Sequence, residues 1–177
     1  MNTILHKKHS KRSFFAVLCT FLLCISLTLP VLASAKVDLS SIEVANKSEI
    51  SGDVYDGAGL LTNDEISSLS DKLAKIENQY QCDVVVLTLN NINGYDIEDY
   101  TDAIFFRRGY GYGNNKDCVM FTISMADRDW RLLTYGFGAT AISNEYGFDY
   151  ITNRVVSKLS DGDYYDAFNT FADLTEA

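Results

Sequence analysis

The run DVVVLTL at residues 83–89 decides the fold, because it is an almost unbroken series of β-branched and aliphatic side chains. A strand of this composition has no polar face to turn toward water. It is therefore predicted to lie inside a sheet that helices cover on both faces. The segments on either side supply those helices and the neighbouring strands.

A helix is predicted immediately before this strand. Thr62 and Glu65 have the spacing of a capping box, and apolar side chains then recur every three or four residues to about Tyr80. After the strand, a turn-forming stretch leads to Asp96. This residue can cap a second helix that ends near Gly109.

Two further strands are predicted as a hairpin, CVMFTIS (118–124) and WRLLTY (130–135), joined by MADRD (125–129). From Gly138 onward the pattern is helical, in two segments that the turn SDGD (160–163) divides. The order helix, strand, helix, strand, strand, helices predicts an α/β fold. We expect a single-domain sandwich with a central mixed β-sheet and helices on both faces.

The N-terminal segment, residues 1–35, has the three parts of a secretory signal peptide: basic residues, an apolar run and Ala33-Ser34-Ala35. Cleavage is expected after Ala35. An uncleaved membrane anchor is the alternative, although the apolar run of 16 residues is shorter than the ~20 that a spanning helix needs. Residues 36–52 are expected to form a flexible tether and residues 53–177 the folded domain. The mature protein is then secreted or extracytoplasmic, with no transmembrane segment.

Charge and histidine content limit the chemistry of the mature chain. Both histidines, His6 and His9, lie in the signal segment, so catalysis by imidazole is excluded. Removal of residues 1–35 takes away four of the 15 basic residues and none of the 24 acidic ones, which leaves a net charge of −13. Such a charge repels nucleic acid and favours divalent cations or basic partners. The alternative is that the negative charge only keeps a secreted protein soluble.

Two cysteines remain after cleavage, Cys82 and Cys118, each at the start of a predicted strand. If these strands are parallel neighbours, both sulfur atoms lie at one end of the sheet. A disulfide there would stabilise the exported protein by roughly 3–4 kcal/mol in the chain-entropy model. Two buried free thiols are the alternative.

The direction of the chain predicts which loops meet. If the helices return antiparallel to the strands, Asp56 and the turn Asp127–Asp129 lie together at the carboxyl end of the sheet. The loop Gly111–Asp117 lies at the opposite end. Ligands of open α/β sheets bind beyond the carboxyl ends of the strands. Asp56, Asp127, Arg128 and Asp129 are therefore the candidate site residues.

Short motifs follow one another along residues 54 to about 174: Val54-Tyr55-Asp56, Gly59-Leu60-Leu61-Thr62, VVVLTL (84–89), Ile97-Glu98-Asp99-Tyr100, Asp127-Arg128, Gly136-Phe137-Gly138 and Gly162-Asp163-Tyr164. In order and spacing they resemble the TPM domain family. The resemblance implies an exported or membrane-anchored α/β sandwich. Members include a thylakoid-lumen protein linked to photosystem II repair and reported to be an acid phosphatase, bacterial proteins that bind calcium, and an animal auxiliary subunit of a ligand-gated channel. The chain departs from the family at Lys116-Asp117-Cys118, where members typically read Asp-Asn-Gly.

The first functional hypothesis is a divalent cation site, with calcium as the expected ion, formed by Asp56, Asp127 and Asp129 with backbone carbonyl oxygens and water. Hard cations prefer such oxygen ligands, and the site needs no histidine. The alternative for these aspartates is structural, because aspartate commonly caps turns and helix ends. In the cation hypothesis the protein supports a membrane or envelope protein complex.

Two other functions are compatible with the sequence. An acid phosphatase would use a metal or Arg128 to neutralise the phosphate of a phosphomonoester while a carboxylate, Asp127, positions water or attacks directly. An interaction module would engage an exported partner protein through the acidic surface and through aromatic side chains in glycine-flanked loops: Tyr110, Tyr112, Tyr146, Phe148 and Tyr150.

Overall fold

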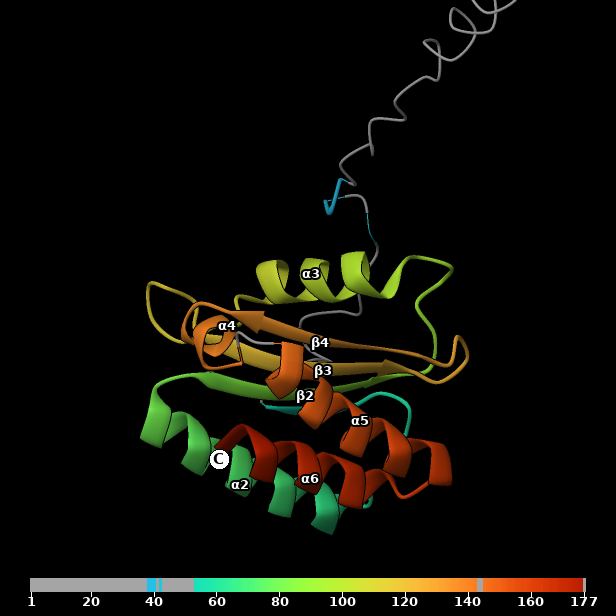
Figure 1. Ribbon diagram of the computed structural model, residues 1–177. Helices are drawn as coiled ribbons and strands as arrows, with labels where there is room; N and C mark the ends of the chain where they lie inside the picture. The colour runs from blue at the N-terminus through green and yellow to red at the C-terminus, as the bar shows by residue number, and fades with distance from the viewer. Residues whose placement is uncertain (1–37, 41, 43–52, 143–144, 177) are drawn as a thin grey trace, which may run out of the picture. The chain divides into compact units, whose positions relative to one another are not determined.

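A computed structural model of the protein describes residues 38–40, 42, 53–142 and 145–176. These residues form four strands and five helices (Figure 1), in the order β1 (Val54–Asp56), α2 (Asn63–Tyr80), β2 (Asp83–Leu89), α3 (Ile97–Arg108), β3 (Cys118–Ser124), β4 (Asp129–Tyr135), α4 (Phe137–Ala141), α5 (Glu145–Asp161) and α6 (Tyr164–Glu176).

The strands form one mixed sheet in the order β1-β2-β3-β4. The first three strands are parallel, and β4 runs antiparallel to β3. β2 has a neighbour on each side, and only its first residue, Asp83, is not fully buried. The prediction that DVVVLTL is an interior strand is therefore confirmed, as are the α/β class and the hairpin of β3 and β4.

Two short elements, β1 and α4, were not predicted as such. β1 has three residues, too few for a periodic pattern, and it exists because it pairs in parallel with β2. α4 has five residues and lies against β3. A Cβ atom on Gly138 would come within 2.3 Å of the carbonyl oxygen of Cys118, so only glycine permits this approach.

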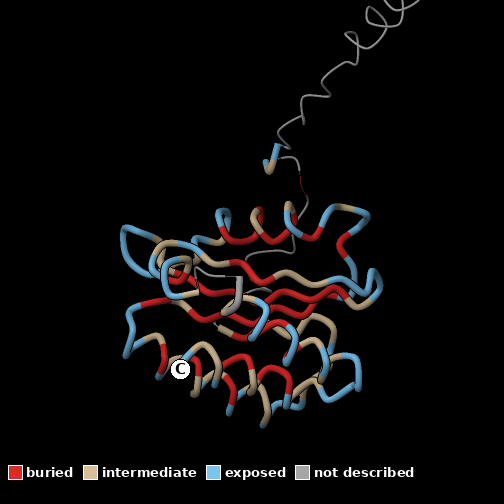
Figure 2. The backbone as a smooth tube through the Cα atoms, in the orientation of Figure 1, coloured by how far each residue is buried: buried red, intermediate tan, exposed pale blue. Residues whose placement is uncertain are grey.

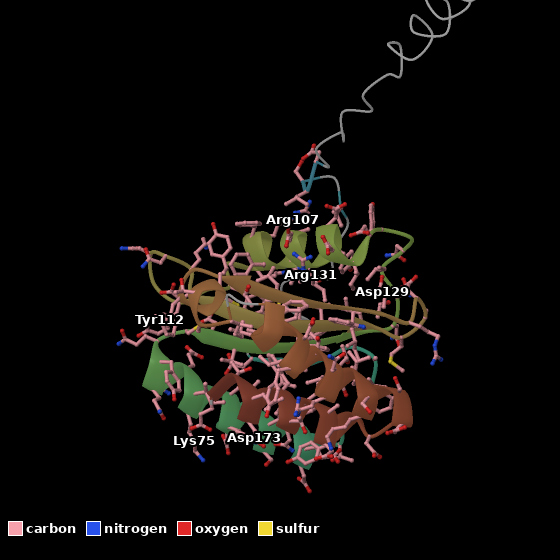
Figure 3. The ribbon with its side chains drawn as sticks, viewed as in Figure 1. Lys75, Arg107, Tyr112, Asp129, Arg131 and Asp173 are labelled. Atoms are coloured by element: carbon pink, nitrogen blue, oxygen red, sulfur yellow. The ribbon has the colours of Figure 1, made fainter. Side chains whose placement is uncertain are left out.

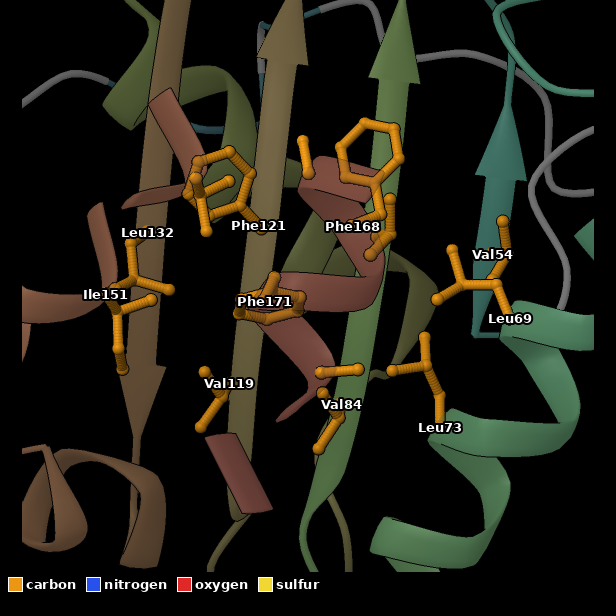
Figure 4. Close-up of a cluster of buried hydrophobic side chains, with 14 of the residues drawn as sticks. Val54, Leu69, Leu73, Val84, Val119, Phe121, Leu132, Ile151, Phe168 and Phe171 are labelled. Atoms are coloured by element: carbon orange, nitrogen blue, oxygen red, sulfur yellow. The ribbon is translucent and has the colours of Figure 1, made fainter. Parts of the chain in front are cut away.

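Helices α2, α5 and α6 cover one face of the sheet (Figures 1 and 2). Their apolar side chains meet those of the strands in the larger of two cores, of which Figure 4 shows a part. The ring centroids of Phe121 in β3 and Phe171 in α6 are 5.5 Å apart. Burial of a phenylalanine side chain stabilises the fold by about 1.5–3 kcal/mol. This core therefore holds three helices on one face.

Helix α3 covers the other face (Figure 1). Its residues Tyr100, Ile104 and Phe105 are buried in a second core with side chains from β2, β3 and β4. Ile42 belongs to the same core and is only 1% exposed. The Arg107 guanidinium on α3 donates hydrogen bonds to the carbonyl oxygens of Leu39 and Ile42. Ile42, within the segment expected to be a tether, is therefore packed in this core; residues 41 and 43–52 of that segment lie outside the described residues.

The predicted helix starts are confirmed. The hydroxyl of Thr62 accepts from the N–H of Glu65, whose carboxylate accepts from the N–H of Thr62 at 2.8 Å. At the start of α3, Asp96 accepts from the N–H groups of Glu98 and Asp99. Both caps lie at the carboxyl end of the sheet, because α2 and α3 begin after β1 and β2.

The expected signal peptide, residues 1–35, lies outside the described residues. Among the helices that the structure does describe, none has the length and apolar character that crossing a membrane requires.

Candidate functional site

The carboxyl ends of β1, β2 and β3 lie at one end of the sheet. Asp56, at the end of β1, is paired in register with Thr88, and Thr88 with Ile123 of β3. The turn that carries Asp127 and Arg128 follows β3 directly. The chain-direction prediction is therefore confirmed: Asp56 and this turn share the carboxyl end. Figure 3 shows Asp129 there and Tyr112 at the opposite end.

Asp56 holds the loop between β1 and α2. Its Oδ1 accepts from the N–H of Leu60 at 3.1 Å and from the hydroxyl of Thr88, and its Oδ2 accepts from the N–H of Leu61 at 2.8 Å. The Thr88 hydroxyl in turn accepts from the N–H of Ala58. Both oxygens of Asp56 thus have a structural role, as the turn-capping interpretation requires.

Asp127 ties the hairpin turn to the loop after β2. Its Oδ2 accepts from the N–H of Ile92 at 3.1 Å and from the hydroxyl of Ser124. The N–H of Ala126 adds a hydrogen bond to the carbonyl oxygen of Asn90. Among the described residues, Oδ1 of Asp127 has no hydrogen-bond donor. One oxygen of this carboxylate is therefore available to a ligand.

Arg128 and Asp129 are exposed at the end of the hairpin. Arg128 adopts the left-handed conformation, with φ of 52°, and forms no ion pair with a described residue. Asp129 accepts from the N–H of Trp130 through Oδ1. Within the described ranges, no three histidine, cysteine, aspartate or glutamate side chains form a group that could hold a metal ion. The three candidate aspartates thus share one end of the sheet, but each accepts hydrogen bonds from a different part of the chain: Asp56 from Leu60 and Leu61, Asp127 from Ile92, and Asp129 from Trp130.

A cavity of about 400 Å³ opens beside Asp129, between the β3–β4 turn and the turn from α5 to α6. Trp130 and Leu159 are part of its apolar wall, and Arg128, Asp129 and Asp161 are polar residues that line it.

 This volume is in the range of small-ligand sites. Sequence reasoning missed the cavity, because its two sides are about 30 residues apart in the chain and no local pattern brings them together.

Cys82 and Cys118 are both free thiols and both buried. β2 and β3 are parallel neighbours, as expected, but Cys118 is in register with Asp83 rather than with Cys82. Cys82 packs in the core beneath α2, whereas Cys118 packs in the core beneath α3. Successive side chains of a strand point to opposite faces, so this register separates the two sulfur atoms. The arrangement favours the free-thiol alternative.

The amino end of the sheet carries acidic groups that sequence reasoning did not single out. Burial raises the pKa of the Asp53 carboxyl, and the charge of Asp83 raises it further. Burial also raises the pKa of Asp83, against the opposing effects of the Gly111 N–H and Lys116. Asp83 begins β2, far from the Asp127 turn. These groups therefore form no part of the candidate site.

Of the five aromatic residues expected in loops, Tyr110 and Tyr112 lie in the loop between α3 and β3, and the other three do not lie in loops. Tyr146, Phe148 and Tyr150 lie within α5, so the loop assignment was wrong for them. Phe148 packs against the larger core, and the Arg154 guanidinium lies 3.5 Å from the ring centroid of Tyr150. The signal that could have corrected this is the helical spacing of apolar residues, which extends back from Ile151.

Comparison with known proteins gives a family match. The TPM domain model matches residues 54–177. The UPF0603 protein YdjH of Bacillus subtilis (strain 168) is 30% identical over 164 residues, which cover 93% of this chain and 59% of that protein. The chain thus spans about three fifths of the length of this relative.

Two solved structures have a similar fold. The N-terminal domain of the cg2496 protein from Corynebacterium glutamicum matches with a TM-score of 0.55 at 15% identity, over 78% of this chain and 86% of that one. The N-terminal domain of a protein from P. gingivalis matches with a TM-score of 0.57 at 22% identity, over 67% and 76%. At these identities the likeness concerns the fold alone.

Proposed function

This chain belongs to the TPM domain family, and we propose that it is an exported protein that binds a divalent cation at the carboxyl end of its sheet. Calcium is the cation of choice, because the candidate ligands are carboxylate and carbonyl oxygens. In this proposal Asp56, Asp127 and Asp129 supply the charge, and the bound domain supports a membrane or envelope protein complex.

The observation that carries the proposal is the position of Asp56 and the Asp127–Asp129 turn at the carboxyl end, where open α/β sheets bind ligands. Oδ1 of Asp127 and Oδ2 of Asp129 have no donor among the described residues, so each can accept a cation. Asp56 would contribute its charge while it keeps its hydrogen bonds to Leu60 and Leu61.

Calorimetry with calcium on residues 36–177 tests this proposal. We expect a dissociation constant of about 0.1–1 mM, the range of extracellular calcium modules. Asp127→Asn should weaken binding about tenfold, because it removes a charge while its amide oxygen can still accept from the N–H of Ile92. Asp71→Asn, on the exposed side of α2, is the matched control and should bind like the wild type. No heat at millimolar calcium would refute the proposal.

The presence of Arg128 beside Asp129 at the cavity favours a second candidate function, an acid phosphatase. Here Arg128 would bind the phosphate of a phosphomonoester while Asp127 orients a water molecule. The water oxygen attacks phosphorus, the ester P–O bond breaks, and the alcohol leaves with a proton. Hydrolysis of p-nitrophenyl phosphate should fall at least tenfold in Arg128→Gln and in Asp127→Asn. Equal rates in wild type and both variants would assign the activity to a contaminant.

A further inference from the structure

The cavity beside the hairpin has an apolar wall. The indole of Trp130 stacks on the ring of Phe121, with centroids 5.9 Å apart and planes inclined by only 4°. Phe121 is fully buried and packs on Phe171, so the wall is anchored in the larger core. Val156 and Leu159 of α5 add aliphatic surface to the cavity. An apolar side chain of a ligand would therefore find a preformed surface.

The polar rim of the cavity is acidic. Among the described residues that line it, Asp129 and Asp161 are acidic and Arg128 is the one cation. Neither aspartate forms an ion pair with a described residue. Lys158 in the same helix pairs with Asp166, whose hydrogen bond raises the pKa of Lys158, and the charge of Asp161 adds to this effect. The rim thus has one carboxylate more than it has cations. It belongs to a mature chain whose net charge is −13.

Asp161 occupies a position that is unfavourable for an acidic residue. It is the last residue of α5, and a negative charge at the C-terminal end of a helix opposes the helix dipole. The adjacent Gly162 has φ of 84°, which ends the helix and turns the chain into α6. Removal of the charge at Asp161 should therefore not destabilise the fold. A loss of binding in that variant would then reflect the lost charge and not unfolding.

From this geometry we infer that the cavity binds a basic segment of a protein partner. An apolar side chain of the segment lies on Trp130, and a neighbouring lysine or arginine pairs with Asp129 and Asp161. The charge complementarity between an acidic rim and a basic segment carries the choice of occupant. The inference rests on the proposed role in a protein complex, and it names the chemistry of that partner.

Trp130 is the only tryptophan of the chain, so its fluorescence reports on this cavity alone. The experiment titrates residues 36–177, in EDTA, with three tryptophan-free hexapeptides. Each has two central leucines, which are flanked by lysines, by glutamates or by serines. We expect a saturable change in Trp130 fluorescence with the lysine peptide, with at least fivefold weaker binding of the serine peptide and none of the glutamate peptide. Added salt should weaken the lysine peptide, because salt screens exposed charges.

Variants locate the binding. Asp161→Asn should weaken the lysine peptide at least threefold, and Arg128→Gln should strengthen it, because it removes a cation from the rim. Asp71→Asn should bind like the wild type. Tighter binding of the glutamate peptide, equal binding by wild type and Asp161→Asn, or no response to any peptide would each overturn the inference. EDTA keeps this test separate from the cation proposal. Calcium binding without peptide binding would refute only the inferred site for a basic segment. Peptide binding without calcium binding would refute only the cation proposal.

Discussion

At the residue scale, the surroundings of Asp53 make its ionised carboxylate unfavourable for folding. Its carboxyl group is half-buried near Asp83, and both effects raise its pKa. A carboxyl group whose pKa is higher in the folded state contributes stability at low pH, and this contribution is lost as the pH rises through the folded-state pKa. At neutral pH, Asp53 therefore opposes folding.

Asp53→Asn should accordingly raise the free energy of unfolding at pH 7. The gain should be on the order of 0.5 kcal/mol, because solvent screens a half-exposed group. The difference from wild type should vanish near pH 3, where the carboxyl group is protonated in both states. Urea unfolding at the two pH values measures it, with Asp71→Asn as the control. A lower stability at pH 7 would contradict the assignment.

A second prediction at the residue scale concerns the reactivity of the thiols of Cys82 and Cys118. Burial, followed by the charges of Asp117 and Asp83, raises the pKa of Cys82 to about 11, and burial also raises the pKa of Cys118. Because the thiolate is the reactive form, both should react slowly with a thiol reagent in the native protein. Unreduced, denatured residues 36–177 should show two reactive thiols. A count of zero that becomes two after reduction would instead establish a disulfide.

At the scale of elements, the packing of α3 on the sheet leaves polar atoms without partners. The hydroxyls of Thr101 in α3 and Thr122 in β3 are buried and have no hydrogen-bond partner among the described residues. Thr122 is in register with Arg131, whose guanidinium pairs with Glu98 of α3. This face thus combines an ion pair at its margin with an unpaired hydroxyl inside it.

Thr122→Val should therefore stabilise the protein by about 1 kcal/mol, because it replaces a buried unpaired hydroxyl with a methyl group of the same shape. Thermal unfolding measures the change, which corresponds to a rise of roughly 2–4 °C in Tm for a chain of this size. Thr62→Val, at the exposed cap of α2, is the contrasting variant and should destabilise. A lower Tm for Thr122→Val would mean that the hydroxyl is paired after all.

At the scale of the whole molecule, the two faces of the sheet are closed in different ways. Three helices cover one face, whereas α3 covers the other together with Ile42 from the segment before β1. Arg107 holds that segment through the carbonyl oxygens of Leu39 and Ile42. Ile42 is therefore part of the second core, and Leu39 packs against it.

Ile42→Ala should lower the free energy of unfolding by about 2–4 kcal/mol, the cost of a cavity in a packed core. Ile42→Val should cost only about 1 kcal/mol. Chemical denaturation of residues 36–177 provides the measurement, with Leu39→Ala as a partly buried comparison. Wild-type stability of Ile42→Ala would show that the segment does not contribute to the core.

Much of the fold and the location of the candidate site could be predicted from the sequence. The boundaries of β2 and β3, the caps at Thr62 and Asp96, and the common end of the sheet for Asp56 and Asp127 all follow from it. These features depend on side chains within a few residues of one another, or on the direction of a chain that alternates strands and helices. Such information is local, so it is present in the order of residues.

Tertiary structure alone decided the rest. It determined that both carboxylate oxygens of Asp56 accept hydrogen bonds from the loop before α2, that the two thiols face different cores, and that Ile42 is buried. It also formed the cavity between the hairpin and the α5–α6 turn. Each of these features depends on partners that are distant in the chain, and their hydrogen bonds, register and burial exist only once the sheet and its two layers of helices have packed.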